Sequence, residues 1–272
     1  MPEAPEVEAL TLFLRERLTG HVVVAVELAE FRALKTRARP LEELVGRSVT
    51  GVERYGKHID VDLGGRHLAI GFGRAGWATW GDGDVASAPP EGAALIATVT
   101  FDDGVLGITD AGDWLSVQLH LVDDPLDVPA VAKLGPDAAR PAFSRDDLVR
   151  ALGKRRKQLK ALLQEQESLA GIGNAYSDEI LFVARLSPLA HAASLGDDEV
   201  TRLHEALRLV LDEAVAARRG VPIAEQKAAK VAAMRVHGRT GEPCPRGDGV
   251  IEDIPGTKGG GQYCPSCQAS PA

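Results

Sequence analysis

The chain has 272 residues, of which 44% are hydrophobic and 26% charged, so it can bury one or two ordinary cores and is neither disordered nor fibrous. Its 31 lysine and arginine residues against 39 acidic ones give a formal net charge of -8, which excludes a generic polyanion binder, so any contact with nucleic acid must come from basic residues gathered on one face. No window approaches the roughly 18 apolar residues needed to cross a membrane, and the first residues lack the basic region and apolar run of a secretion signal, so we expect a cytoplasmic protein without a membrane partner.

The first 121 residues predict a β-rich domain that opens with a helix. From Glu6 to Leu18, apolar residues recur at spacings of three and four, as they do on one face of a helix. Three later segments alternate between apolar and polar residues as strands do, and clusters of glycine and proline separate them. These segments are Val22–Leu28, His58–Leu63 and Ala94–Phe101.

After residue 121 the spacing of apolar residues changes from the alternation typical of strands to the spacing typical of helices. Residues 122–143 begin with a stretch rich in aspartate and proline and predict a linker. Residues 144–234 predict a helical domain, in which Ser144 caps the first helix and Leu159–Leu169 and Asp197–Ala217 continue in helical spacing. The remaining residues, 235–272, are rich in glycine and proline. The predicted class is therefore α+β.

The amino terminus carries the first group of candidate catalytic residues. Removal of the initiator methionine would expose Pro2 as a secondary amine with a pKa of about 8, which can attack C1′ of an opened sugar and form an iminium. Glu3 and Glu6 lie beside it, where one can donate a proton to the sugar ring and the other can orient the nucleophile. The alternative is an ordinary polar start without a catalytic role.

A basic run and a glycine-rich turn form the second group. The run has five cations in seven residues, which makes a local patch suited to phosphates in an otherwise acidic protein. After it, the glycines of residues 171–173 break one helix and open the next, so that backbone N–H groups and the Asn174 amide can meet a phosphate. The alternative is a solvated helix face followed by a plain turn. The cations singled out are Lys154, Arg155, Arg156 and Lys160.

The three cysteines point to a metal site or its remnant. They cannot pair off completely, and all lie after residue 240, two of them in the sequence Cys264-Pro265-Ser266-Cys267. Such clustering does not fit a disulfide framework.

Four short segments, taken in order, resemble the formamidopyrimidine-DNA glycosylase and endonuclease VIII family. The resemblance covers essentially the whole chain, and one segment is pinned to the first residue. It implies an N-terminal β-sandwich with flanking helices (1–121), a linker (122–143), a helix-two-turn-helix DNA-binding domain (144–234) and a zinc-finger-like β-hairpin (235–272). The segments are Met1-Pro2-Glu3-Ala4-Pro5-Glu6-Val7-Glu8, Gly56-Lys57, Leu169–Leu181 and His237–Pro245.

The resemblance also implies roles for these residues. Pro2 would be the Schiff-base nucleophile, Glu3 the general acid that opens the deoxyribose, and Glu6 a supporting carboxylate. Lys57 would bind the phosphate beside the lesion and assist strand cleavage, while Asn174 and Lys160 match the family's phosphate contacts. The implied reaction is excision of a damaged base that has been turned out of the stack, followed by strand cleavage through β- and δ-elimination. The implied partner is damaged DNA, double- or single-stranded, bound by a monomer.

The metal motif departs from the family pattern by one ligand. The family pairs two Cys-x-x-Cys hairpins, but here Gly247 stands where a thiolate is expected. Cys244, Cys264 and Cys267 therefore need a fourth ligand to hold Zn²⁺, and Asp248 is the foremost candidate. A water molecule or His237 are alternatives, and so is a hairpin that has lost zinc and folds on its own contacts.

Three further departures concern recognition. Arg74 and Trp114 stand where the family has void-filling side chains, and both could insert and stack, although packing within the β-rich domain is the alternative. Asp113 replaces an arginine beside Trp114, and Lys258 is the nearest cation to the place of the family's finger arginine. Residues 220–234 are short for a loop that caps 8-oxoguanine, which favours oxidised pyrimidines, abasic sites, and single-stranded or bulky substrates.

Two functions remain open from the sequence. The first is a bifunctional DNA glycosylase and abasic-site lyase of base excision repair. The second is a non-enzymatic sensor or specialised binder of abasic, distorted or bulky-adduct DNA, which the altered void-filling and finger residues motivate. Retention of Met1 distinguishes them, because an amide-linked Pro2 has no nucleophilic lone pair. A third interpretation is a zinc-ribbon protein with an incidental basic helix. It requires the amino-terminal resemblance to the glycosylase family to be accidental.

Overall fold

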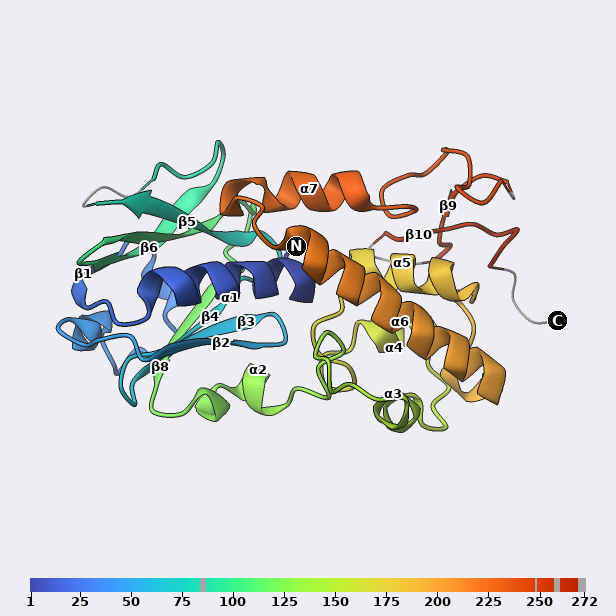
Figure 1. Ribbon diagram of the computed structural model, residues 1–272, viewed down its shortest axis with the longest axis horizontal. Coiled ribbons are helices and arrows are strands. Elements are labelled where there is room, and N and C mark those ends of the chain that lie inside the picture. The colour runs from blue at the N-terminus through green and yellow to red at the C-terminus, as the bar shows by residue number, and fades with distance from the viewer. Residues whose placement is uncertain (84–86, 248, 257–259, 269–272) are drawn as a thin grey trace. The chain divides into compact units, whose positions relative to one another are not determined.

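The computed structural model describes residues 1–83, 87–247, 249–256 and 260–268, and it divides into two compact units (Figure 1). Unit 1 comprises residues 1–133 and 220–226, and unit 2 comprises residues 134–219 and 227–272. The predicted boundaries placed residues 220–226 with the helical domain, but they group with the β-rich unit, in which the Trp77 indole N–H donates to the carbonyl of Ile223 (2.7 Å). None of the helices among the described residues is long and apolar enough to span a membrane.

Unit 1 is built on two antiparallel sheets, which confirms the predicted β-sandwich. Among the described residues, one sheet has the strand order β1-β6-β7-β5 and the other β2-β3-β4-β8. Its helices and strands are α1 (Ala4–Leu18), β1 (Val23–Leu28), η1 (Phe31–Ala33), η2 (Leu41–Leu44), β2 (Gly51–Tyr55), β3 (His58–Asp62), β4 (His67–Gly71), β5 (Gly76–Asp82), β6 (Ala94–Phe101), β7 (Gly104–Asp110), β8 (Gln118–Val122), η3 (Pro125–Asp127), α2 (Pro129–Ala132) and η5 (Ile223–Glu225).

One hydrophobic core holds the sheets and α1 together. Helix α1 buries the apolar stripe that the sequence predicted, Val7, Leu10, Leu14 and Leu18, in the same cluster as residues of both sheets. The helix begins at Ala4, two residues before the predicted start, because Pro5 fits a first helical turn, where its missing N–H costs no hydrogen bond. The strands predicted from alternation are present as β1, β3 and β6.

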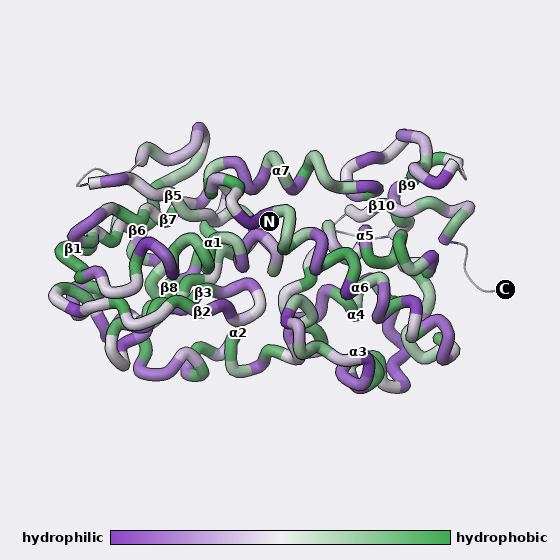
Figure 2. Tube along the Cα trace, in the orientation of Figure 1, coloured by the Kyte–Doolittle hydropathy of each residue, from purple (hydrophilic) through white to green (hydrophobic). Residues whose placement is uncertain are grey.

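Unit 2 is helical and ends in a small hairpin. Its elements are α3 (Arg145–Leu152), α4 (Leu159–Leu163), α5 (Asn174–Ala184), η4 (Ala192–Ser194), α6 (Asp197–Arg218), α7 (Gln226–Ala233, of which Gln226 belongs to unit 1), β9 (Glu252–Asp253) and β10 (Gln262–Tyr263). Figure 2 shows α6 alternating between hydrophilic and hydrophobic residues, as expected of a helix with one buried stripe.

The start of α3 confirms the predicted cap, whereas α4 is shorter than expected. The Ser144 hydroxyl accepts the backbone N–H of Asp147 (3.2 Å). Helical spacing predicted one stretch over Leu159–Leu169, but α4 ends at Leu163. The chain turns there because the Gln166 side chain binds backbone groups of the loop, donating to the Ile172 carbonyl (2.7 Å) and accepting the Gly171 N–H (3.0 Å).

Candidate active site

Two buried carboxylates lie at the start of α1, next to Pro2. The backbone N–H of Glu3 donates to the Glu6 carboxylate (3.1 Å), and the Glu3 carbonyl accepts the N–H of Val7 (3.0 Å). Glu3 is 1% and Glu6 2% exposed, and the half-buried Pro2 directly precedes them. The partial positive charge of a helix N-terminus favours carboxylates in this position. The structure therefore brings the three predicted catalytic residues of the amino terminus together in one turn.

Lys57 lies in the tight turn between β2 and β3. Tyr55 and His58 form the last pair of the ladder, and Gly56 takes a φ of 57°, which glycine adopts without strain. Arg54 ties this turn to α1, because its Nη1 donates to the Gly56 carbonyl (2.8 Å) and its Nε to Oε2 of Glu8 (2.6 Å).

Neither Arg54 nor Glu8 was predicted from the sequence as a site residue. The signal for Arg54 was available, since it shares the inward face of β2 with the buried Val52. A buried cation on the core side of a strand requires a partner.

Arg74 and Trp114 lie in two exposed connections of unit 1. Arg74 is exposed between β4 and β5, and Trp114 is 87% exposed between β7 and β8. Trp114 is therefore displayed to solvent rather than packed within the unit, which excludes the packing alternative for this side chain.

In unit 2, Asn174 begins α5 directly after the glycine-rich turn, as the sequence predicted. Gly173 is the N-cap residue, and the Gln164 side-chain amide donates to Oδ1 of Asn174 (3.3 Å). Lys160 lies inside the unit, 5% exposed, where its ammonium forms an ion pair with Asp178 and donates to the carbonyl of Asn174 (3.2 Å). In this structure the buried Lys160 therefore stabilises the first turn of α5 from the interior of unit 2.

The basic run divides into exposed and paired cations. Lys154 and Arg156 are exposed. Arg155 and Lys157 both pair with Glu165, each at 2.6 Å, and hydrogen bonds from Arg155, then Lys157, lower the pKa of Glu165 to about 2. The local positive charge available to an anion is therefore concentrated on Lys154 and Arg156.

The three cysteines gather in the hairpin. Their sulfur atoms all lie within 4.8 Å of one another, and Sγ of Cys244 is 3.9 Å from Sγ of Cys267. Zinc–sulfur bonds of about 2.3 Å in a tetrahedron place sulfur atoms roughly 3.8 Å apart, so the spacing fits three thiolates on one zinc ion. Burial, followed by hydrogen bonds from the neighbouring thiols, raises the pKa of Cys267 to about 12, so a cation is needed to hold the cluster deprotonated.

The fourth ligand is not settled by the described residues. Asp248 and Lys258, both candidate site residues, lie outside them. Within the described part of the chain, the group that could hold a metal comprises the three cysteines, and Nδ1 of His237 is instead 2.7 Å from Oδ2 of Asp178.

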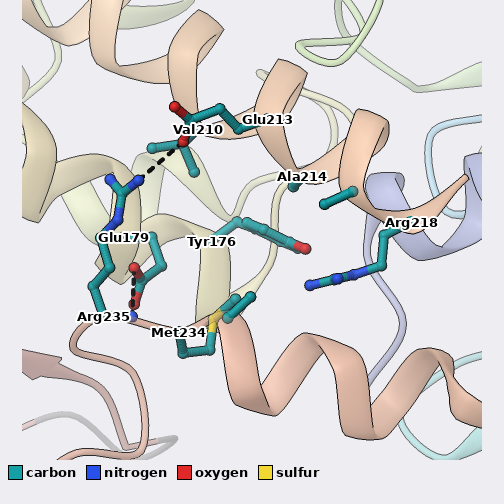
Figure 3. A pocket seen from close by; sticks show the side chains of 10 residues that line it. Tyr176, Glu179, Val210, Glu213, Ala214, Arg218, Met234 and Arg235 are labelled. Atoms are coloured by element: carbon teal, nitrogen blue, oxygen red, sulfur yellow. Dashed lines mark hydrogen bonds and ion pairs between the residues drawn. The ribbon is translucent and has the colours of Figure 1, made fainter. Parts of the chain in front are cut away.

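Two adjacent acidic residues of α5, neither of which was predicted to have a role, hold the hairpin. Besides Lys160 and His237, Asp178 accepts the backbone N–H of Gln262 in β10 (3.0 Å). Glu179 accepts the backbone N–H groups of residues 235–237 at 2.9 to 3.0 Å. In Figure 3, Glu179 lies beside Arg235 at the rim of a cavity of about 210 Å³ that Tyr176 and Arg218 also line.

Family comparisons agree with this arrangement. Residues 1–112 match the formamidopyrimidine-DNA glycosylase N-terminal domain, and residues 134–224 match the formamidopyrimidine-DNA glycosylase H2TH domain. The chain belongs to the formamidopyrimidine-DNA glycosylase family. The family resemblance inferred from four short segments is thereby confirmed, together with its α+β fold.

Relatives of this family match either nearly the whole chain or about half of it. The formamidopyrimidine-DNA glycosylase of Heliobacterium modesticaldum is 34% identical and covers 98% of this chain and 100% of its own. An uncharacterized formamidopyrimidine-DNA glycosylase-like protein of Mycobacterium tuberculosis is 43% identical over 52% of this chain and 87% of its own. The crystal structure of wild-type Lactococcus lactis Fpg (MutM) with DNA containing N7-benzyl-Fapy-dG is 26% identical, with a TM-score of 0.87, and covers 99% of this chain and 100% of its own.

Proposed function

We propose that this protein is a base excision repair glycosylase that removes damaged bases and cleaves the strand with the Pro2 amine. The observation that carries this proposal is the turn in which Pro2 precedes two buried carboxylates, Glu3 and Glu6. After Met1 is removed, the Pro2 nitrogen attacks C1′ while Glu3 protonates the sugar ring oxygen and the C1′–O4′ bond breaks. The bound amine then gives up its own proton, the bond from C1′ to the base breaks as an iminium forms, and the base leaves with a proton. Glu6 holds the backbone N–H of Glu3 and so fixes the geometry of the turn.

Cations and the start of α5 supply the phosphate contacts. Lys57 extends from a turn that Arg54 fixes against α1, which suits it to a phosphate next to the reacting sugar. Asn174 and the first N–H groups of α5 provide a helix N-terminus of the kind that binds phosphate. The exposed Lys154 and Arg156 add charge that attracts either strand of DNA.

Zinc bound by Cys244, Cys264 and Cys267 is part of the proposal, with Asp248 as the fourth ligand. The sulfur spacing supports it. The ion would hold the two arms of the hairpin together and would take no part in the chemistry at C1′.

The substrate class follows from residues 220–234. Helix α7 takes up eight of them, which leaves little chain for a loop that closes over an oxidised purine. This supports a preference for oxidised pyrimidines and abasic sites, in double- or single-stranded DNA.

The decisive experiment is borohydride trapping on abasic-site DNA, with the amino terminus checked by mass spectrometry. We expect a covalent adduct at Pro2 in the processed protein, and its loss in Pro2→Gly. Glu3→Gln should abolish excision of a damaged base, while both variants keep abasic-DNA binding within about tenfold, because they change the chemistry and not the phosphate contacts. Glu16→Gln, which alters an exposed carboxylate of the same helix, is the matched control and should retain full activity.

The two functions give different results in this assay. Full excision by Pro2→Gly and Glu3→Gln would refute the assignment. A confirmed proline terminus that binds abasic DNA without forming an adduct would instead establish the sensor function.

A further inference from the structure

The loop that displays Trp114 is organised by one buried carboxylate, Asp110, at the end of β7. Asp110 is 4% exposed and accepts four hydrogen bonds: from the N–H of Gly112 (2.9 Å), the N–H and hydroxyl of Ser116 (2.7 and 2.9 Å) and the N–H of Val117 (3.0 Å). Burial raises its pKa, but these donors outweigh burial and lower it overall. Asp110 therefore stays ionised and holds residues 111–117, the β7–β8 loop, at both ends.

Ser116 joins this loop to the β4–β5 turn, residues 72–75. Its hydroxyl oxygen accepts the backbone N–H groups of Arg74 (3.1 Å) and Ala75 (3.2 Å) while the hydroxyl donates to Asp110. The N–H of Ala111 also donates to the Ala75 carbonyl (3.1 Å). Contact is so close at Gly73, which has a φ of 55°, that a Cβ there would lie 2.3 Å from the Ser116 carbonyl oxygen. The two connections thus form one rigid element.

The tip of this element is suited to bases rather than to the phosphate backbone. Trp114 is 87% exposed, and an indole displayed on a backbone that is held in place indicates a binding surface. Its neighbour Asp113 is also exposed, and its negative charge repels phosphate. The face of an unstacked base is uncharged and stacks on aromatic rings.

We propose that Asp110 and Ser116 are positioning residues that hold Trp114 as a stacking platform for a base in duplex DNA. The role of the platform in catalysis rests on the proposed function, because stacking matters for excision only if the protein acts on a base turned out of the duplex. Asp110 and Ser116 do not touch DNA in this proposal. They act through Trp114, so their effect must disappear when the indole is absent.

The test is a double-mutant cycle of Asp110→Asn and Trp114→Ala on duplex and single-stranded substrates. Each single variant should slow duplex excision about tenfold, the scale of one lost base–aromatic stack. The double variant should be no slower than Trp114→Ala, and all three should act on single strands within twofold of wild type. Asp102→Asn is the matched control, since this exposed loop carboxylate also accepts a backbone N–H (Val22, 3.2 Å) and should leave duplex excision unchanged.

Tryptophan fluorescence gives a second readout, which requires DNA binding but no catalytic activity. The signal specific to Trp114, obtained by subtracting the spectrum of Trp114→Ala, should be quenched by abasic duplex DNA in wild type and largely unquenched in Asp110→Asn. Ser116→Ala keeps the backbone bonds to Asp110 but removes the acceptor for Arg74, and should give the same result even if Asp110→Asn folds poorly.

Additive effects of Asp110→Asn and Trp114→Ala would overturn the positioning role, and so would normal quenching in both Asp110→Asn and Ser116→Ala. A wild-type protein that quenches on DNA but never forms an adduct would refute the proposed function while leaving the platform in place.

Discussion

The buried ion pair between Arg54 and Glu8 gives the sharpest stability prediction for unit 1. The Arg54 side chain is 1% exposed and that of Glu8 16%, so Glu8→Gln removes a charged partner from a guanidinium in the interior. Removing one partner of a buried pair costs about 3 to 5 kcal/mol, and the lower end applies here because glutamine keeps an acceptor oxygen. At roughly 3 °C per kcal/mol, a loss of about 3 kcal/mol lowers the melting temperature by about 9 °C.

The same change should also impair catalysis through Lys57. Arg54 holds the carbonyl of Gly56, so a displaced guanidinium loosens the turn that carries the lysine. We expect strand cleavage at abasic sites to slow more than DNA binding. The assays are differential scanning calorimetry and single-turnover cleavage of an abasic duplex.

Glu53→Gln is the control, because Glu53 also joins β2 to α1. Its ion pair with Arg15 (3.1 Å) has side chains 55% and 38% exposed, and exposed pairs contribute less than about 1 kcal/mol. Equal melting temperatures for the two variants, or an unchanged melting temperature for Glu8→Gln, would refute the reasoning that burial makes the Arg54 pair critical.

Four further outcomes are expected. Asn174→Ala should weaken binding to undamaged and damaged DNA alike in gel-shift titrations, because the contact proposed for it is with phosphate, and a loss confined to one lesion would contradict that. Asp178→Asn should remove the charge of the carboxylate that pairs with the buried Lys160 ammonium and speed hydrogen exchange of the hairpin amides, at a cost of about 3 kcal/mol. Cys264→Ser should lower zinc, measured by mass spectrometry, from about one ion per chain to almost none. The contribution of Glu165, whose pKa is lowered, should be present above pH 4.5 and lost as the pH falls towards 2, so Glu165→Gln should show a shallower loss of melting temperature in that range than wild type.

Local patterns in the sequence were sufficient for several elements, and they placed the candidate catalytic residues of the amino terminus next to one another. Apolar spacing located α1 and α6, alternation located β1, β3 and β6, and the Ser144 cap was correctly placed. These features depend on neighbours within a few residues, which a sequence displays directly. The same holds for the candidate residues of the amino terminus, because Pro2, Glu3 and Glu6 lie within a single helical turn.

The residues that the sequence analysis missed are those whose partners are distant along the chain. Glu8 and Arg54 are 46 residues apart, and Ser116, which was not predicted as a site residue, is 42 residues from its partner Arg74, which was. Periodicity cannot reveal such pairs, because it records only the face on which a side chain lies. The end of α4 was missed for a related reason, since a side chain from the following loop, that of Gln166, decides where the chain turns.

Helix α5 explains how the hairpin keeps its place although one zinc ligand of the family motif is missing. Near the end of α5, the Arg246 guanidinium lies 4.5 Å from the centre of the Phe182 ring and donates to the Val183 carbonyl (3.1 Å), while the Gln268 amide donates to the Leu186 carbonyl (3.0 Å).

Within the helix, Asp178 and Glu179 hold backbone N–H groups that lead into and out of the same hairpin. These contacts involve no cysteine, so loss of the metal should loosen the cysteine cluster without detaching the hairpin from α5. Because Asp178 also pairs with Lys160, which supports the carbonyl of Asn174, one carboxylate connects an attachment point of the hairpin with the geometry of the proposed phosphate contact.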